Sequence, residues 1–295
     1  MSAQAERPSR TYLREDAFRY CERLARTHYE NFTVGSLLLP RRARRHVYAV
    51  YGFCRTVDDL GDEVRGDRLA LLDNWEAELR QCFEGTPTHP VMVALQETVS
   101  TFDIPREPFL KLIEANRMDQ RQSRYPTFHD VLHYCDHSAN PVGRLFLHLF
   151  GYRDQERQRL SDHTCTALQL ANFWQDVARD YAKGRIYIPQ EDMARFGYTE
   201  ADLARGVCND SFQRLMAFQA ERAEEHFRQG LPLAGTLKGI VKLDVALFSL
   251  GGLEVLKAIR RQRYDVLSRR PRLSRTRKAW LFLSTWAKMK LGRGV

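Results

Sequence analysis

The sequence predicts an all-α protein. Alternating runs of β-branched and polar residues bounded by turn pairs, which are typical of strands, do not occur. Apolar residues instead recur at helical spacing along most of the chain. Short stretches rich in proline and glycine interrupt this pattern and divide it into segments of helical length. We expect about ten helices.

The expected elements follow one another without a long linker. We expect the polar residues 1–12 to form a flexible N-terminus. The clearest amphipathic helices are "HVYAVYGFCRTVDDL" (46–60), "CTALQLANFWQDVARDY" (165–181) and "SFQRLMAFQAERAEEHF" (211–227). Breaks are expected at 37–40, 85–90, 102–105, 124–126, 184–189 and 230–232. None of these breaks is long or compositionally distinct enough to separate domains, so we expect a single domain over 1–295.

Composition narrows the classes of function without choosing one. The net charge of +9 suits nucleic acid, an anionic membrane or a phosphorylated small molecule. The basic residues are dispersed and match no known nucleic-acid motif, so a nucleic-acid partner is not expected. The six cysteines form no CxxC pair and are expected to be reduced and buried. The polar N-terminus lacks a signal-peptide core, and no apolar run reaches membrane-spanning length. These features predict a cytoplasmic protein.

The C-terminal tail, 271–295, is basic and carries interleaved aromatic residues. It has two interpretations. It is either a last amphipathic helix packed on the body of the protein, or an interfacial helix on anionic lipid at the inner face of the membrane.

One acidic cluster is "RTVDDLGDE" (55–63). In a helix, Asp58 and Asp62 lie one turn apart on one face, and Asp59 and Glu63 form a second, rotated pair. Like charges at this spacing destabilise a helix, and Gly61 costs about 1 kcal/mol relative to alanine. Mg²⁺ held by carboxylates and substrate phosphates would relieve the repulsion. The alternative is a solvated acidic face bridged by Arg55.

A second cluster favours the metal-binding interpretation. Asn172, Asp176 and Asp180 lie at i, i+4 and i+8 on another predicted helix, and Gln169 precedes them on nearly the same face. The apolar residues upstream predict that this stripe points toward the core. Buried carboxylates need partners, and several divalent ions with a diphosphate between them would supply these.

Four stretches together resemble the squalene/phytoene synthase family. "YAVYGFCRTVDDLGDE" and "LQLANFWQDVARDYAKGRIYIP" are similar to its two metal-binding signatures, while "YCDHSANPVG" (134–143) and "HYENF…LLLP" are similar to two further segments. The resemblance runs from about residue 15 to 270. It implies an isoprenoid (terpenoid) synthase fold around a central cavity, with aromatic candidates Phe32, Tyr51, Phe53, Phe146, Phe150 and Phe173 to line it.

The resemblance also implies site residues. Asp58 and Asp62 on one side of the cavity, and Asn172, Asp176 and Asp180 on the other, would bind two or three Mg²⁺ ions with the diphosphate. Tyr51, Arg55 and Gln169 would contact that diphosphate. The remaining substrate-binding candidates are Glu30, Asn31, Phe32, Tyr134, Gln175, Lys183, Arg185 and Tyr187.

Two departures from the family pattern narrow the expected reaction. Glu30 stands where members that condense two prenyl diphosphates often have lysine, and Gln175 stands where many have a charged residue. The carboxylate of Glu30 would repel a second diphosphate. The pattern resembles the hydroxysqualene synthase branch, which implies conversion of presqualene diphosphate and water to hydroxysqualene and diphosphate, and handover to other enzymes of the squalene pathway. Asn140 and Pro141 also depart from the family pattern and predict a helix kink.

Three alternatives remain open. In the first alternative, the protein condenses two farnesyl diphosphates to presqualene diphosphate, squalene or dehydrosqualene. Phytoene synthesis from C20 units is a further option within the family. In another class, it would be a non-catalytic helical assembly factor, although such a protein has no need for a complete set of metal ligands. No glycine-rich dinucleotide motif follows a strand, so NADPH is not expected.

Overall fold

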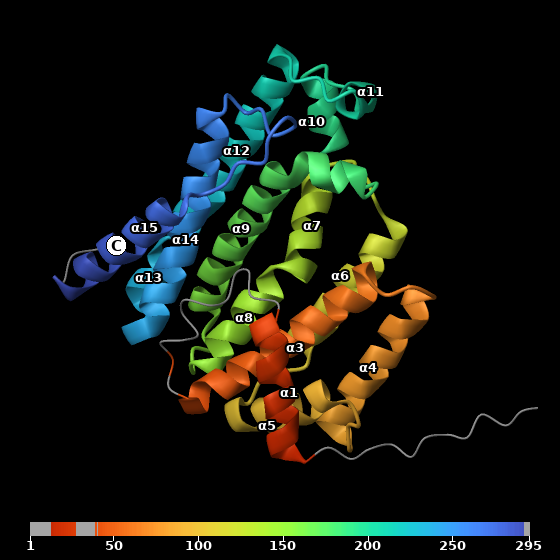
Figure 1. Cartoon of the computed structure of the whole chain (residues 1–295), viewed down its shortest axis with the longest axis vertical. Helices are drawn as coiled ribbons and strands as arrows, with labels where there is room; N and C mark the ends of the chain where they lie inside the picture. Colours follow the sequence, from red (N-terminus) through yellow and green to blue (C-terminus); the bar gives the residue numbers. More distant parts are fainter. Residues whose placement is uncertain (1–12, 28–38, 40, 292–295) are drawn as a thin grey trace, which may run out of the picture. The chain divides into compact units, whose positions relative to one another are not determined.

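The computed structural model describes residues 13–27, 39 and 41–291. These residues are almost entirely helical or in short turns, and the described part of the chain contains no strand (Figure 1). A single isolated bridge joins Arg124 and Ile186. The all-α prediction is therefore confirmed. Contacts along the chain divide it into two compact units, Met1–Arg117 and Met118–Val295, and each is described by itself.

The first unit holds α1 (Arg14–Thr27), α3 (Arg41–Asp62), α4 (Arg68–Glu84), α5 (Pro90–Phe102) and most of α6 (Glu107–Arg121). Helix α3 packs against α1, α4 and α5. Phe53 of α3 is fully buried, with its ring against those of Trp75 and Phe109. Phe53 is thus part of the core of this unit, which corrects its assignment as a cavity aromatic.

Local signals set the ends of these helices. Asp67 caps α4 by accepting a hydrogen bond from the backbone N–H of Ala70, and Pro90 begins α5 where its missing N–H costs nothing. Asp103 ends α5 in the left-handed conformation, with φ of 51°. The breaks predicted at 85–90 and 102–105 therefore occur where expected.

The second unit is built around α9 (Gln155–Ala182), the longest of the described helices. It packs against α7 (Phe128–Ser138), α8 (Asn140–Leu149), α12 (Asp210–Gly230), α13 (Pro232–Thr236) and α14 (Gly239–Arg261). Figure 1 shows α9, α12 and α14 side by side. The short helices α10 (Gln190–Arg195) and α11 (Glu200–Ala204) and the last helix α15 (Arg275–Lys290) complete the unit.

The predicted kink is a full break between two helices. Helix α7 ends at Ser138 and α8 begins at Asn140, with Pro141 in its first turn, where proline is tolerated. The side-chain oxygen of Asn140 accepts a hydrogen bond from Thr166 of α9 at 2.9 Å. This buried polar contact holds the start of α8 on the central helix.

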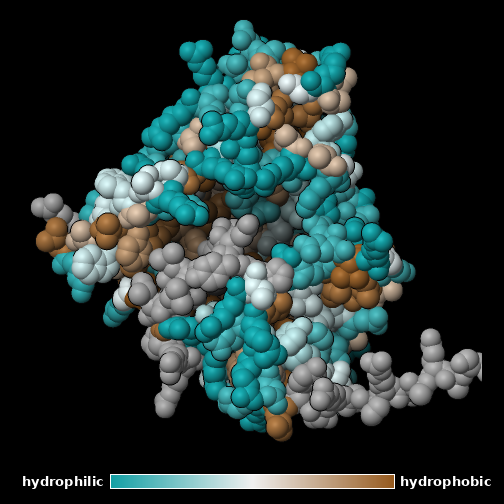
Figure 2. Space-filling model, in the orientation of Figure 1, coloured by the Kyte–Doolittle hydropathy of each residue, from teal (hydrophilic) through white to brown (hydrophobic). Residues whose placement is uncertain are grey.

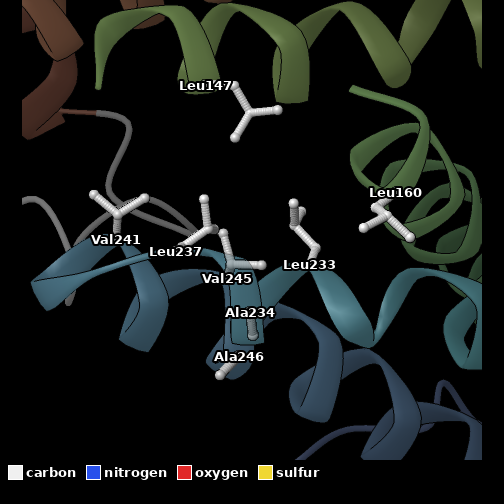
Figure 3. Close-up of a cluster of buried hydrophobic side chains, with 8 residues drawn as sticks. All are labelled: Leu147, Leu160, Leu233, Ala234, Leu237, Val241, Val245 and Ala246. Atoms are coloured by element: carbon white, nitrogen blue, oxygen red, sulfur yellow. The ribbon is translucent and has the colours of Figure 1, made fainter. Parts of the chain in front are cut away.

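An apolar cluster joins α8, α9, α13 and α14 (Figure 3). Leu147 and Leu160 meet side chains from the end of α13 and the start of α14. Each leucine or valine among them contributes about 1.5–3 kcal/mol when fully buried. Phe146 and Phe150, two of the predicted cavity aromatics, are only partly buried beside this cluster. The buried members are Leu147, Leu160, Leu233, Ala234, Leu237, Val241, Val245 and Ala246.

All six cysteines are free thiols, as the sequence predicted. Cys21, Cys82 and Cys135 are buried, while Cys54, Cys165 and Cys208 are partly accessible. Among the helices described, none combines the length and the apolar character that crossing a bilayer requires.

Candidate functional site

Four polar residues form one stripe on α3. Tyr51, Arg55, Asp58 and Asp62 are spaced i, i+4, i+7 and i+11, which places them on one helix face. Asp58 is exposed to solvent and the other three are partly exposed. The stripe is therefore accessible to a ligand, and both carboxylates predicted as metal ligands belong to it.

Arg55 neutralises the second, rotated acidic pair. Its guanidinium lies 2.5 Å from a carboxylate oxygen of Asp59 and 2.8 Å from one of Glu63. The alternative of an arginine bridge is thus correct for Asp59 and Glu63. It does not extend to Asp58, to which Arg55 makes no direct contact in the structure, although its charge stabilises that carboxylate.

Gly61 allows a polar side chain from α6 to approach α3 closely. A Cβ atom at position 61 would collide with the side-chain amide of Asn116. Asn116 donates hydrogen bonds to a carboxylate oxygen of Asp58, at 3.4 Å, and to the carbonyl of Leu112, at 3.1 Å. The glycine, which costs helix propensity, therefore makes room for a donor that supports Asp58.

The protonation of Asp58 is shifted by its surroundings. Atoms packed around the carboxylate displace part of its water, and this desolvation raises the pKa of Asp58 to about 6. The hydrogen bond from Asn116 and the charge of Arg55 act in the opposite direction, while Asp62 and Asp59 add to the increase. A bound cation would favour the ionised form and reverse the shift.

The second stripe lies on α9. Asn172 is exposed, and Asp176 and Asp180 are partly exposed. The prediction that this stripe points into the packed core was therefore wrong. The apolar residues that suggested it, such as Leu170 and Ala171, occupy the neighbouring faces of α9 and are buried there. The acidic stripe remains accessible, as a binding site requires.

Arg270 binds Asp176 in a bidentate ion pair. Its Nε lies 2.6 Å from Asp176 Oδ1, and one of its terminal nitrogens lies 2.7 Å from Oδ2. The same guanidinium donates to Gln175 Oε1 at 3.1 Å, and the Gln175 amide donates to the carbonyl of Pro271. Gln175 is 7% exposed. In this structure it holds the segment that carries Arg270.

Asp180 is the most perturbed group of the second stripe. Desolvation, followed by the charge of Asp176, raises the pKa of Asp180 to about 7. Lys183 and Arg185 oppose this increase through their positive charges. Lys183 is the exposed residue at the end of α9. The two predicted cationic residues that follow the stripe thus act on its last carboxylate.

Asp119, at the end of α6, organises three of the predicted substrate-binding residues. It accepts hydrogen bonds from the hydroxyls of Tyr134, at 2.9 Å, and Tyr187, at 3.4 Å. Arg185 lies 3.7 Å from the same carboxylate. Both tyrosines are nearly buried, so their hydroxyls are engaged inside the second unit.

These tyrosines belong to an aromatic stack. The rings of Phe173 and Tyr187 are parallel, with centroids 3.9 Å apart, and Tyr125 stacks on the other side of Tyr187 at 5.4 Å. Tyr134 packs beside Phe173 and Tyr187. The stack rigidifies the connection that follows α9 and places apolar rings one turn from Asp176.

Three predicted substrate-binding residues lie outside the described residues. They are Glu30, Asn31 and Phe32. Their roles stay predictions from the sequence.

The two stripes offer donors that fit Mg²⁺. Their candidate ligands are carboxylates and one amide oxygen, and hard oxygen donors are what Mg²⁺ prefers. Within the described residues, no three His, Cys, Asp or Glu side chains are grouped closely enough to hold a metal by themselves. Mg²⁺ commonly takes one or two protein carboxylates and completes its shell with water and phosphate oxygens.

A family model for squalene/phytoene synthase matches residues 25–277, which is most of the chain. The chain belongs to the squalene/phytoene synthase family. Its α-helical structure is the isoprenoid synthase fold of that family, and the protein is an enzyme that processes prenyl diphosphates.

Related proteins support the family and differ in specificity. The chain is 33% identical to a 15-cis-phytoene synthase of Synechococcus elongatus, over 96% of this chain and 94% of that protein. Among solved structures, squalene synthase HpnC from Alicyclobacillus acidocaldarius is 50% identical, with a TM-score of 0.83 over 87% of this chain and 97% of that one. A dehydrosqualene synthase solved with a ligand is 29% identical, with a TM-score of 0.86 over 94% and 98% of the two chains.

Sequence reasoning missed several residues at the site. Asn116, Asp119 and Arg270 lie far along the chain from the residues they contact, so no local spacing reveals them. Elsewhere in the second unit, the buried carboxyl of Asp244 on α14 was also missed. It is 6% exposed, and a carboxyl at a core-facing helix position is the one signal that could have identified it.

We expect Gly61→Ala to lower activity although alanine is the better helix former. The added Cβ displaces Asn116, and loss of a hydrogen bond of about 1.4 kcal/mol corresponds to roughly a tenfold weaker response to Mg²⁺. Steady-state rates over a range of Mg²⁺ concentrations measure this.

Gly235→Ala is the matched control. Gly235 is an exposed helical glycine whose Cβ would meet no atom within 4 Å. This variant should keep its activity and gain a little stability. If Gly61→Ala behaves in the same way, Asn116 does not need its close approach to α3.

Proposed function

We propose that this enzyme converts presqualene diphosphate and water to hydroxysqualene and diphosphate, with Mg²⁺ bound by its two acidic stripes. The observation that carries the proposal is that Asp58, Asp176 and Asp180 keep solvent-accessible carboxylates, so that each stripe can still accept a ligand. The 50% identity to a squalene synthase supports a C30 substrate. The phytoene synthases at lower identity support C20 condensation as the main competitor.

Mg²⁺, when bound, would act as a Lewis acid toward the phosphate oxygens. Asp58 and Asp62 would hold it in the first unit, and Asn172, Asp176 and Asp180 would hold it in the second. Arg270 now occupies both oxygens of Asp176. A cation at Asp176 would free that guanidinium to bind phosphate, which it matches in charge and geometry.

The proposed reaction balances without a reductant. The bond between a carbon of the C30 substrate and the diphosphate oxygen breaks, and its electron pair leaves with the diphosphate. The cyclopropane ring of the cation opens, and a water oxygen forms the new bond to carbon. The water proton passes to a base or to solvent. An aromatic face such as that of Phe173 stabilises a cation of this kind in a site that excludes bulk water.

We propose that Asp244 holds the water molecule that attacks the cation. Burial alone raises the pKa of this carboxyl to about 7. No hydrogen bond or ion pair to it exists among the residues that the structure describes. Its neighbours along the helix, Val241 and Val245, are buried and apolar. The hydrogen-bonding groups of a buried carboxyl without a protein partner are usually satisfied by water or a ligand. Asp244 is therefore suited to hold one water molecule beside the apolar side chains of α14.

The metal and substrate assignments are tested together. Presqualene, farnesyl and geranylgeranyl diphosphates are each supplied without NADPH. We expect hydroxysqualene from the first, with ¹⁸O incorporated from labelled water, and little product from the other two. Asp58→Asn and Asp176→Asn should each lose about a hundredfold or more in rate, since Lewis-acid stabilisation is worth several kcal/mol. Glu221→Gln, an exposed acid on α12, should retain full activity.

Efficient phytoene formation from geranylgeranyl diphosphate would contradict the substrate assignment, and robust presqualene diphosphate formation from farnesyl diphosphate would favour the condensing alternative. Near-normal rates in either aspartate variant at saturating Mg²⁺ would instead contradict the metal-binding role of the stripe that carries that aspartate. Circular dichroism confirms that each variant remains helical.

The role of Asp244 has its own test. Asp244→Leu removes the water ligand, so we expect the product to shift from the alcohol toward hydrocarbons formed by proton loss. Asp244→Asn keeps a hydrogen-bonding group and should keep the alcohol as main product. Ser249→Ala is the control on the same helix, because Ser249 already bonds the carbonyl of Val245. An unchanged product ratio in a folded Asp244→Leu enzyme would exclude this role.

A further inference from the structure

Helix α15 presents large apolar side chains to solvent. Trp280 is 56% exposed, Leu283 is 61% exposed and Trp286 is 48% exposed. Their spacing places them on one broad face together with Ala279 and Ala287. Figure 2 shows apolar surface, in brown, over the region where Figure 1 draws α15. Exposing two tryptophans and a leucine on one helix is costly unless that face has a partner.

The opposite face of α15 fixes its orientation on the second unit. Leu281 and Thr285 are buried, and α15 packs against α14. Arg277 donates to Glu254 of α14 at 2.8 Å, and Lys257 binds the other oxygen of the same carboxylate. These contacts lower the pKa of Glu254 to about 2. The apolar face therefore points outward because the helix is docked by its other side.

Positive charge is concentrated in the C-terminal segment that carries this face. Residues 266–295 contain nine Lys and Arg residues and no Asp or Glu. Arg270 and Arg277 bind acids on other helices. Six exposed basic residues make no ion pair within the described part of the chain: Arg269, Arg272, Arg275, Lys278, Lys288 and Lys290.

We propose that the outward face of α15 binds the surface of a membrane that contains anionic phospholipid. Tryptophan and leucine insert at the level of the headgroups, while flanking lysine and arginine side chains reach the lipid phosphates. Lys290 lies 5.8 Å from the Trp286 ring centroid and Arg277 lies 4.5 Å from that of Trp280, so cation and aromatic ring are already adjacent.

Charge favours lipid over a second copy of this chain. Two copies that met through this face would bring two sets of unpaired cations together without a single acid from α15 on either side. Opposed like charges weaken such a contact. An anionic surface instead gains from each cation, on the order of fivefold in affinity per Lys or Arg near the headgroups.

The four tryptophans make binding directly observable. Trp75 and Trp174 are buried, at 5% and 0% exposure, so a change in emission on binding reports on α15. The full chain is mixed with vesicles of phosphatidylcholine alone, or with 30% phosphatidylglycerol. We expect a blue shift and quenching by brominated lipid only with the anionic vesicles, and both effects should decrease at high salt.

Substitutions separate the two contributions. Leu283→Ser with Trp286→Ser should abolish flotation with anionic vesicles, whereas Leu69→Ser, at an exposed leucine of α4, should not. Arg275→Gln with Lys290→Gln, at exposed residues on or beside the apolar face, should weaken binding by about 25-fold from the two lost charges. Arg80→Gln with Arg214→Gln removes two exposed charges elsewhere and should leave binding unchanged.

Two outcomes would overturn the proposal. One is equal binding to neutral and anionic vesicles, or no binding to either. The other is self-association in sedimentation velocity that the Leu283→Ser and Trp286→Ser substitutions abolish, because the face would then belong to a second copy of the chain.

Discussion

Repulsion between carboxylates one helical turn apart is the constraint on which the candidate site depends. Helices α3 and α9 each carry acidic residues at this spacing, and a helix bears such charges only if something offsets them. Each unit offsets part of its own charge with arginine side chains. Arg55 binds Asp59 and Glu63, and Arg270 binds Asp176. The carboxylates of Asp58 and Asp180 instead respond through raised pKa values.

The surroundings of the two stripes follow from this constraint. Asn116 reaches Asp58 only because residue 61 lacks a side chain. Gln175 is turned into the protein, where it holds the segment that places Arg270 on Asp176. Asp119 engages the hydroxyls of Tyr134 and Tyr187 and so fixes the aromatic stack beside α9. Each of these contacts orients a carboxylate or an aromatic ring, and together they fix the positions of the solvent-accessible carboxylates.

The sequence was most informative where the signal is local. Helical spacing predicted both acidic stripes, and proline and glycine predicted the breaks at 85–90 and 102–105, while Asn140 and Pro141 predicted only a kink where the structure has a full break. It failed where a contact joins distant segments. Arg270 lies 94 residues from Asp176, and the role of Gly61 depends on a side chain of α6. Burial was also misjudged, because apolar neighbours of Asn172 indicate a buried helix without indicating which of its faces is buried.

The number of protons released when Mg²⁺ and diphosphate bind tests most directly whether the acidic stripes hold the metal. Calorimetry of Mg²⁺ with inorganic diphosphate is run near pH 6.5 in buffers of different ionisation enthalpy. Asp58 and Asp180, with pKa values raised to about 6 and 7, are partly protonated there. A bound cation favours their charged forms, so binding should release protons from the protein in addition to those that Mg²⁺ displaces from the diphosphate, and the protein's contribution should fade above about pH 8. The Asp180→Asn variant should release fewer protons than the Glu221→Gln control. Equal release by the two variants would contradict the account.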